Sequence, residues 1–437
     1  MIRRIWAKGR APLVFAGLLA VVPPSSARAD VYMQVGGASQ AAPAIALAVP
    51  PFIAGAPYDA DSAKAARTIE GVVVDDLLFS RYFKIMQDGA HWTGSNLTAA
   101  VSDWQTRGAA WLLTAQASAV KSEISVMVQL INMQSGNVEF SRVYRQEAAY
   151  KRSLAHKISD DVVHDLTGKK GIAESEIAFS NDSTGHKEIY LMDYDGANLR
   201  RMTWDRSICL LPRFSPDKSL LVFTSYRDGN PDLFGINLAT GRREVVSNAQ
   251  GLNVAGGFSP DGAKLLLTMS RERTPSIYLK NLTDGSLTRL TENFGTDSSP
   301  TFSPDGAQVA FVSDVSGNPE IYLMDTTTLS ATRITSLAWC DSPAWSPTGA
   351  WIAFAGRANA GDNLDIFLVD VTGTQIRRLT NGEGANEDPR WSPDGRFIVF
   401  SSTRNGRSQI FMMDADGSAP HVVADIPGNS ITPAWSN

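Results

Sequence analysis

The chain has 437 residues, 43% of them hydrophobic and 19% charged, which is typical of a globular protein with two or three domains. Its formal net charge is −5, and it contains two cysteines and five histidines. An acidic chain lacks the excess of positive charge on which nucleic-acid binding depends, so that class of function is excluded.

The first 29 residues have the pattern of a secretory signal peptide. Four basic residues lie within the first ten, an apolar run covers 11–22, and Ala27-Arg28-Ala29 forms a small-residue cleavage site before Asp30. A membrane anchor is the competing interpretation, but a run of this length is too short to cross a bilayer. Cleavage between Ala29 and Asp30 would remove five basic and no acidic residues, which changes the net charge to −10. We therefore expect an exported, soluble, acidic mature protein.

Residues 30–43, at the start of the mature chain, mix a short apolar run with Gly, Ser and Gln. Two interpretations stay open. The segment is either a frayed end with one edge strand, because chain termini are commonly mobile, or a docking segment for another protein.

Strands and helices alternate from residue 45 to residue 166, which predicts a compact α/β domain. We expect this domain to cover residues 30–167, with residues 30–43 as its mobile N-terminal segment. Apolar periodicity predicts strands at 45–49, 82–86, 110–119, 123–133 and 139–144, and helices at 62–78 and 150–166. Ser62 is the expected cap of the first helix, and Gly168 is expected to end the second in the left-handed conformation.

The rest of the chain, residues 168–437, is built from repeats. The pattern Trp391-Ser392-Pro393-Asp394-Gly395 recurs, and Ser-Pro-Asp-Gly suits a tight turn before an apolar strand. The aromatic residues that open each copy are Phe214, Phe258, Phe302, Trp345, Trp391 and Trp435. A period of 40 to 50 residues with turn signals predicts a β-propeller with one four-stranded blade per repeat.

A second signature, Glu188 to Asp193, marks the third strand of a blade and recurs around five further aromatic residues, which predicts six blades. The blade that holds Tyr190 has no opening strand near residue 170, whereas Pro433 to Ser436 has no blade of its own to begin. We infer that the C-terminal strand completes the first blade and closes the ring. The predicted fold is thus an α+β two-domain protein, an N-terminal α/β domain followed by a six-bladed β-propeller closed by the C-terminal strand.

The two cysteines, Cys209 and Cys340, fall in blades that are three apart in a ring of six. A disulfide requires Cα atoms within about 7 Å. Opposite blades place the residues farther apart, so we expect two free thiols.

Catalytic motifs are missing from the sequence. Gly-x-Ser-x-Gly, His-Glu-x-x-His, Cys-x-x-Cys and the phosphate-binding Gly-x-x-x-x-Gly-Lys do not occur. Asp193 to Gly196 and Asp414 to Gly417 resemble calcium loops but lack the full ligand pattern, so we expect hairpin turns there and the metal site is the weaker alternative. No catalytic residue, cofactor or metal is predicted.

The repeats diverge most at one end of the predicted propeller. This end, the loop face, carries the connections between second and third strands and the connections from one blade to the next; the other end, the turn end, carries the Ser-Pro-Asp-Gly turns. Six such loops around a channel mouth would form a broad concave surface suited to a macromolecule. Alternatively, their polar side chains only cap loop backbone. The candidate binding residues are Arg227, Leu252, Asn253, Ala255, Asp297, Ser298, Ser299, Asp341, Asn386, Glu387 and Arg404.

The signal sequence, the α/β domain and the six repeats together resemble the TolB family, the periplasmic propeller proteins of the Tol-Pal cell-envelope system. Ile45 to Phe52 and Leu166-Thr167-Gly168 stand where that family has an Ile/Val-Pro-Phe strand and a Leu-Thr-Gly linker. The resemblance implies a non-enzymatic periplasmic adaptor that supports outer-membrane integrity, cell division and protein import.

The resemblance also implies partners. The loop face would receive the peptidoglycan-associated lipoprotein Pal, and the mature N-terminus would bind the inner-membrane protein TolA; other outer-membrane proteins are further candidates, nucleic acid is not, and a monomer is expected. The implied TolA segment is Asp30, Val31, Tyr32, Met33, Gln34 and Val35. The sequence departs from the family at Leu252, where a histidine is usual, and at Ser299, where an acidic residue is usual.

The alternative from another class is an exported propeller enzyme, a hydrolase or a quinone-dependent sugar dehydrogenase. Such an enzyme needs a cluster of catalytic side chains that converge on the channel. Only His186 and His421 fall in the predicted propeller, at dissimilar positions of the repeat, and they form no such cluster.

Overall fold

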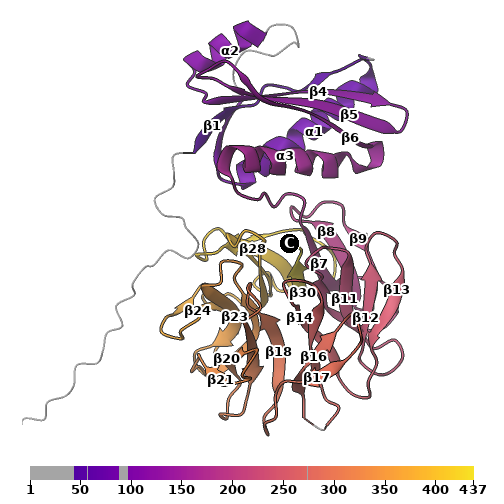
Figure 1. Ribbon diagram of the computed structural model, residues 1–437, viewed down its shortest axis with the longest axis vertical. Coiled ribbons are helices and arrows are strands. Elements are labelled where there is room, and N and C mark those ends of the chain that lie inside the picture. Colours follow the sequence, from indigo (N-terminus) through magenta and orange to yellow (C-terminus); the bar gives the residue numbers. More distant parts are fainter. Residues whose placement is uncertain (1–43, 57, 88–96, 273) are drawn as a thin grey trace, which may run out of the picture. The chain divides into compact units, whose positions relative to one another are not determined.

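The computed structural model describes residues 44–56, 58–87, 97–272 and 274–437 (Figure 1). The expected signal peptide and the expected TolA segment lie outside the described residues. The described chain forms an α/β region followed by a six-bladed β-propeller.

The α/β region is a mixed sheet in the order β3-β1-β4-β5-β6, with β2 paired to β4. Strand β1 pairs in parallel with β3 and β4, whereas β4, β5 and β6 are antiparallel. Apolar residues of α1 and α3 are buried together with one face of this sheet in a common core. The elements are β1 (Ile45–Ala48), β2 (Ile53–Ala54), α1 (Ala60–Phe79), β3 (Phe83–Met86), α2 (Leu97–Thr106), β4 (Trp111–Val120), β5 (Glu123–Asn132), β6 (Val138–Glu147), the 3-10 turn η1 (Ala148–Tyr150) and α3 (Lys151–Thr167).

Two predictions about the helices of this region need correction. The cap of α1 is Asp59, whose carboxylate accepts a hydrogen bond from the Ser62 N–H at 2.8 Å. The Ser62 hydroxyl instead accepts from the Ala119 N–H at 3.0 Å, so it ties the helix to β4. Helix α2 was not predicted; its buried Trp104 anchors it to the sheet. The predicted end of α3 is confirmed, since Gly168 has φ 69°.

The propeller consists of six four-stranded antiparallel sheets, as predicted. Blade 1 contains β30 (Ser430–Trp435), β7 (Glu176–Asn181), β8 (Glu188–Asp193) and β9 (Arg200–Arg201); blade 2 contains β10 (Cys209–Phe214), β11 (Leu220–Ser225), β12 (Asp232–Asn237) and β13 (Arg243–Ser247); blade 3 contains β14 (Asn253–Phe258), β15 (Lys264–Met269), β16 (Ser276–Asn281) and β17 (Leu287–Arg289). Blade 4 contains β18 (Asp297–Phe302), β19 (Gln308–Ser313), β20 (Glu320–Asp325) and β21 (Ala331–Arg333); blade 5 contains β22 (Trp339–Trp345), β23 (Trp351–Arg357), β24 (Asp365–Asp370) and β25 (Ile376–Arg378); blade 6 contains β26 (Asn386–Trp391), β27 (Phe397–Ser402), β28 (Gln409–Asp414) and β29 (His421–Val422).

The Ser-Pro-Asp-Gly turns are locked by their own side chains. In blade 3 the Gly262 N–H donates to the Ser259 carbonyl at 2.8 Å, and the Ser259 hydroxyl donates to the Asp261 carboxylate at 2.5 Å. That carboxylate also accepts from the Ala263 N–H. The motif therefore supplies both the turn conformation and its hydrogen bonds, which is why it recurs, with small changes, after the opening strands of blades 2 to 6.

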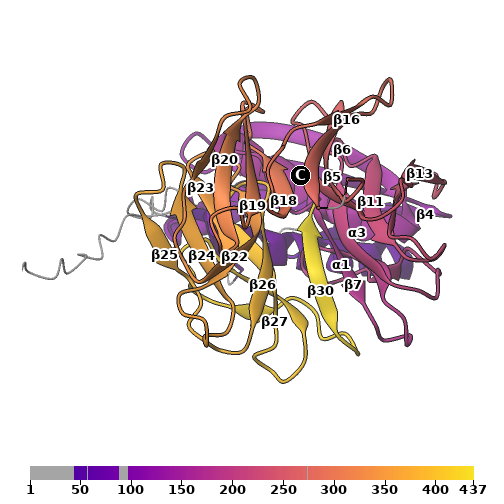
Figure 2. The same ribbon diagram turned by 90° about the horizontal axis from the view of Figure 1, so that it is seen from below.

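The ring is closed by the two ends of the propeller sequence. Strand β30 pairs with β7 as the innermost strand of blade 1, and the two lie side by side in Figure 2. The Trp435 indole N–H donates to the Ser175 hydroxyl at 2.8 Å, and the Ser436 N–H donates to the Glu176 carbonyl at 2.9 Å. The predicted closure by the C-terminal strand is confirmed.

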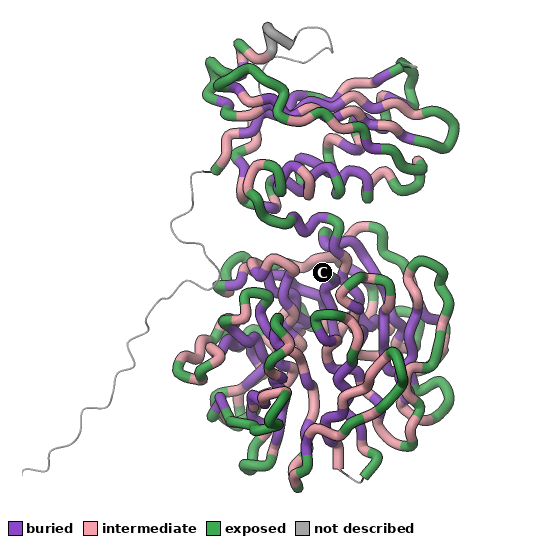
Figure 3. The backbone as a smooth tube through the Cα atoms, in the orientation of Figure 1, coloured by how far each residue is buried: buried purple, intermediate pink, exposed green. Residues whose placement is uncertain are grey.

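The middle strands of every blade carry buried apolar residues. Figure 3 colours the buried residues of the chain purple. No helix in the described ranges is long and apolar enough to span a membrane.

Deletion of residues 430–437 should destroy the cooperative unfolding of the propeller. The deletion removes β30 with its nearly buried Trp435 and exposes the edge of β7, and loss of a large core side chain alone costs about 3–5 kcal/mol. Thermal denaturation followed by circular dichroism is the measurement. Deletion of the exposed Asn437 alone is the matched control and should leave the midpoint unchanged. A stable protein without β30 would contradict ring closure.

Candidate loop-face binding site

The loop face and the α/β region lie at opposite ends of the propeller. Three turn-end residues of the propeller contact the α/β region: the Arg396 guanidinium donates to the Ser80 carbonyl, Asp414 pairs with Arg81, and Asp195 pairs with Arg152. The connections of the loop face leave the blades at the other ends of the same strands. The α/β region therefore leaves the loop face open to a partner.

Several candidate residues of the loop face are buried inside it. Asn253, Asp297 and Asn386 are at most 1% exposed, and Ala255 is 2% exposed. The Asn253 amide donates to three backbone carbonyls of its own loop and its neighbour, at 2.7–3.1 Å. Side chains in these positions hold the loop backbone and expose almost none of their own surface.

The other candidate residues retain exposed surface. Arg227 is exposed, whereas Leu252, Ser298, Ser299, Asp341, Glu387 and Arg404 are partly buried. The structure brings Ser299 and Asp341 together across a blade junction, where the Ser299 hydroxyl donates to the Asp341 carboxylate at 3.3 Å. These two residues come from the innermost strands of neighbouring blades, so they lie at the channel and not at the outer rim.

The innermost strands share a bulge that turns polar side chains toward one another. Each opening strand shifts register with its neighbour at this point. In five of the six blades the bulge holds a non-glycine residue with φ of 51–55°, a region that such residues rarely occupy. These residues are Leu211, Ser299, Ser342, Asp388 and Thr432.

Two acidic candidates have pKa values that reflect this crowding. Burial raises the pKa of Asp341, and the charge of Asp388 raises it further. Burial also raises the pKa of Glu387, together with the charges of Asp388 and Asp341. The acidic groups of blades 5 and 6 thus share one electrostatic environment near the channel.

Exposed aromatic side chains form a second feature of the loop face, which sequence reasoning missed. Phe294 is fully exposed, and Trp204 is 67% exposed. Tyr226 and Trp339 are also more than one-third exposed. Trp204, Tyr226 and Phe294 belong to connections between second and third strands or between blades, and Trp339 is the first residue of β22, directly after such a connection. The sequence signal that could have revealed these residues is an aromatic residue outside the two repeating aromatic positions, in a segment otherwise rich in polar residues.

Local contacts hold the rings of Trp204 and Trp339 and the loop that carries Phe294. The Arg201 guanidinium lies 5.5 Å from the Trp204 ring centroid, and Arg357 lies 5.6 Å from that of Trp339. Phe294 follows Asn293, whose side chain accepts from the Gly295 N–H at 2.8 Å and donates to Asp297 at 2.9 Å. The loop therefore presents Phe294 on a fixed turn.

The two cysteines are free and buried, as expected. Burial raises the pKa of the Cys209 thiol to about 12, and it also raises the pKa of Cys340. The Cys340 thiol lies 3.3 Å from the Glu320 carboxylate, so it acts as a donor inside a blade junction.

The two segments that resemble calcium loops are hairpin turns, as expected. The Gly196 N–H donates to the Asp193 carbonyl and the Gly417 N–H to the Asp414 carbonyl, both at 2.9 Å. What the sequence did not reveal is that the aspartates of both turns pair with arginines of the α/β region.

Comparison with known proteins places this architecture in a family. The model of the TolB amino-terminal domain matches residues 33–138, and that of the TolB beta propeller domain matches residues 163–339 and 336–437. The chain belongs to the TolB family. It is similar to a crystal structure of TolB from Acinetobacter baumannii, with a TM-score of 0.76 and 27% sequence identity, over 90% of this chain and 96% of that chain.

Curated relatives match over shorter segments. A protein TolB homolog of Chlorobium chlorochromatii is 36% identical over 186 residues, which is 42% of each chain. A Tol-Pal system protein TolB of Geobacter sulfurreducens is 37% identical over 212 residues, 47% of this chain and 48% of that one. The chain therefore aligns with slightly less than half the length of these relatives.

Both thiols should resist modification in the folded protein. A thiol-specific reagent reacts with the thiolate, and burial together with a raised pKa keeps the thiolate population of Cys209 and Cys340 negligible near neutral pH. Ellman's reagent should detect no rapid reaction before unfolding and two thiols per chain in denaturant. Rapid labelling of either native thiol would contradict the burial, and an absence of thiols after unfolding would indicate a disulfide.

Proposed function

We propose that this protein is a non-enzymatic periplasmic adaptor of the Tol-Pal cell-envelope complex. The loop face binds the lipoprotein Pal, and the mature N-terminus binds TolA, so that the protein supports outer-membrane integrity and envelope invagination during cell division. Support comes from membership of the TolB family and from relatives that are named Tol-Pal system proteins.

The observation that carries the Pal proposal is the set of exposed aromatic residues around the open loop face. Protein interfaces draw most of their binding energy from a few anchors, and aromatic and arginine side chains are enriched among them. Phe294, Trp204 and Trp339 are such anchors, and the rings of Trp204 and Trp339 already lie against arginines. Ordering these two tryptophans on binding would therefore cost little side-chain entropy. Buried neighbours such as Asn253 keep the backbone of the surface fixed.

The TolA proposal rests on the family resemblance of Asp30–Val35 and on its place at the expected mature N-terminus. We further propose that Pal binding releases or sequesters this segment, which couples the two partners energetically. Such coupling is reciprocal, so TolA must change the affinity for Pal by the same factor.

Pal binding should depend on Phe294 and Trp339. Replacing both with alanine is expected to weaken binding by about 30-fold or more, since an aromatic hot spot contributes about 2 kcal/mol or more. Titration calorimetry with purified Pal is the measurement. Leu329→Ala is the matched control, because Leu329 is an exposed apolar residue at the turn end.

The controls decide the interpretation of this titration. Circular dichroism must show that the double variant is folded. An equal loss of affinity in Leu329→Ala would place the binding surface elsewhere. No binding by the folded, unmodified protein would overturn the proposed function.

Removal of residues 30–40 should abolish TolA binding and change the response of Pal affinity to TolA. The segment carries the proposed TolA contacts, so its loss removes both the direct interaction and the coupling. Calorimetry of Pal binding with and without TolA measures both effects. If the truncated protein kept its Pal affinity and the same dependence on TolA, the coupling proposal would fail.

A further inference from the structure

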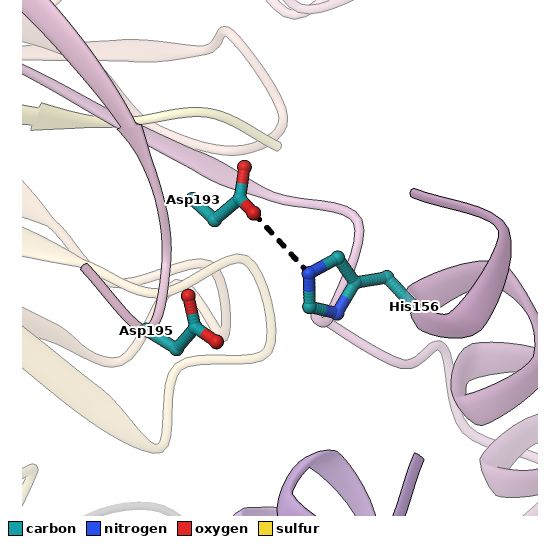
Figure 4. Close-up of side chains that lie close together, drawn as sticks. All are labelled: His156, Asp193 and Asp195. Atoms are coloured by element: carbon teal, nitrogen blue, oxygen red, sulfur yellow. Dashed lines mark hydrogen bonds and ion pairs between the residues drawn. The ribbon is translucent and has the colours of Figure 1, made fainter. Parts of the chain in front are cut away.

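The α/β region is joined to blade 1 by a buried polar network centred on His156. This residue belongs to α3 and is 3% exposed. Its Nδ1 lies 2.9 Å from the Asp76 carboxylate of α1, and its Nε2 lies 3.4 Å from the Asp193 carboxylate at the end of β8. Figure 4 shows the ring directed at Asp193, with Asp195 close by. One imidazole thus contacts a carboxylate from each part of the protein.

Two further residues complete the network across the same interface. The Tyr194 hydroxyl donates to the second oxygen of Asp76 at 2.8 Å, and its ring stacks edge-on against His156. The Ser159 hydroxyl donates to Asp76 at 2.8 Å. All three donors to Asp76 are therefore fixed, and the carboxylate is fully satisfied only while His156 donates.

The positive charge in this network comes from protein side chains. His156, Asp193 and Asp195 place atoms that could bind a metal ion within 4.8 Å of one another. Both imidazole nitrogens face carboxylates, however, and Arg152 pairs with both Asp193 and Asp195. The positive charge that balances these aspartates is thus supplied by protein side chains, and a proton on His156 is part of that balance.

The charged groups of this network come from every element packed against His156. Asp76 of α1 and Asp193 of blade 1 contact the ring, and around these two aspartates lie Asp75 of α1, Arg152 and Asp160 of α3, and Asp195 of blade 1. Negative groups outnumber positive ones around the ring. Burial alone lowers the pKa of His156, but the hydrogen bonds and charges of Asp193 and Asp76 outweigh burial and raise the pKa to about 9.

We propose that His156 is a proton-dependent clamp, which as an imidazolium joins the Asp76 carboxylate of α1 to the Asp193 carboxylate of blade 1 and on losing its proton loosens the α/β region from the propeller. A neutral imidazole carries one N–H only. The shorter contact to Asp76 keeps that proton, so the Nε2 lone pair then faces the Asp193 carboxylate and the contact across the interface becomes repulsive. This proposal goes beyond the adaptor function and does not depend on it.

The direction of the pH dependence follows from the raised pKa. The clamp is complete below the ordinary histidine value of 6.5 and is lost as the pH rises through about 9. The contacts of Arg152 and Tyr194 persist in this range, so the interface loosens while both parts stay folded.

The first test is the titration of His156 itself in the full-length protein. Labelling with histidine carrying carbon-13 at Cε1 gives one NMR signal per histidine, and loss of a signal in His156→Gln assigns it. We expect a midpoint near 9, and Asp193→Asn should shift it downward because a charge partner is removed. A midpoint below about 7 in the unmodified protein would overturn the clamp.

The second test measures the interface. Spin labels on Ser141→Cys in β6 and Glu244→Cys in β13 report the distance between the two parts, and the buried native cysteines stay unlabelled. The distance distribution should be narrow at about pH 7 and broader at about pH 10, above the histidine transition. In Asp193→Asn, where the pKa of His156 is expected to be lower, the distance distribution should broaden at a correspondingly lower pH.

The controls separate the clamp from general alkaline effects. The distance distribution of His156→Gln should be broad at both pH values. The matched variant His164→Gln, in an exposed position of the same helix, should behave as the unmodified protein. An unmodified protein whose distance distribution stays constant while the His156 signal titrates would overturn the proposal, even if His156→Gln does not fold.

Discussion

A buried carboxylate at the start of the third strand joins one blade to the next, and the loop face depends on it. Glu188, Glu320 and Asp365 occupy this position and are at most 3% exposed. Each accepts a hydrogen bond from a buried threonine fifteen residues later and from a backbone N–H of the connection to the next blade. A buried charge without such partners would cost several kcal/mol, so the carboxylate enforces the path of that connection.

The chemistry of the junction is complementary between neighbouring blades. Where the third strand begins with an acid, as at Glu320 or Asp365, the next blade opens with a neutral donor, Cys340 or Asn386. Where the third strand begins with Ser276, the next blade opens with Asp297 instead. At these three junctions one of the two strand-opening positions holds a carboxylate and the other a neutral group, so two facing carboxylates do not repel each other there. The cysteines are therefore explained as neutral donors of the scaffold rather than as a redox pair.

Much of the fold was predictable because its signals are local. The turn motif and the third-strand motif repeat with nearly constant spacing, so the number of blades and their closure by Trp435 followed from counting. The site was less predictable. Asn253 and Asp297 were expected in loops but are the first residues of β14 and β18, and whether a side chain points inward there depends on its neighbours in the next blade. The partners of His156 lie 80 and 37 residues away, and no local pattern marks them.

Strand β8 connects these two kinds of contact. Its six residues are all buried, Glu188 at one end holds the loop that carries Trp204, and Asp193 at the other end contacts His156. A tightly packed strand bends little, so a displacement at one end moves the whole strand. The loop face and the interdomain contact therefore share one rigid element. Because the inward-facing residues of the loop face are committed to this framework, the surface that the proposed adaptor function needs is left to outward-facing side chains, foremost Trp204, Phe294 and Trp339.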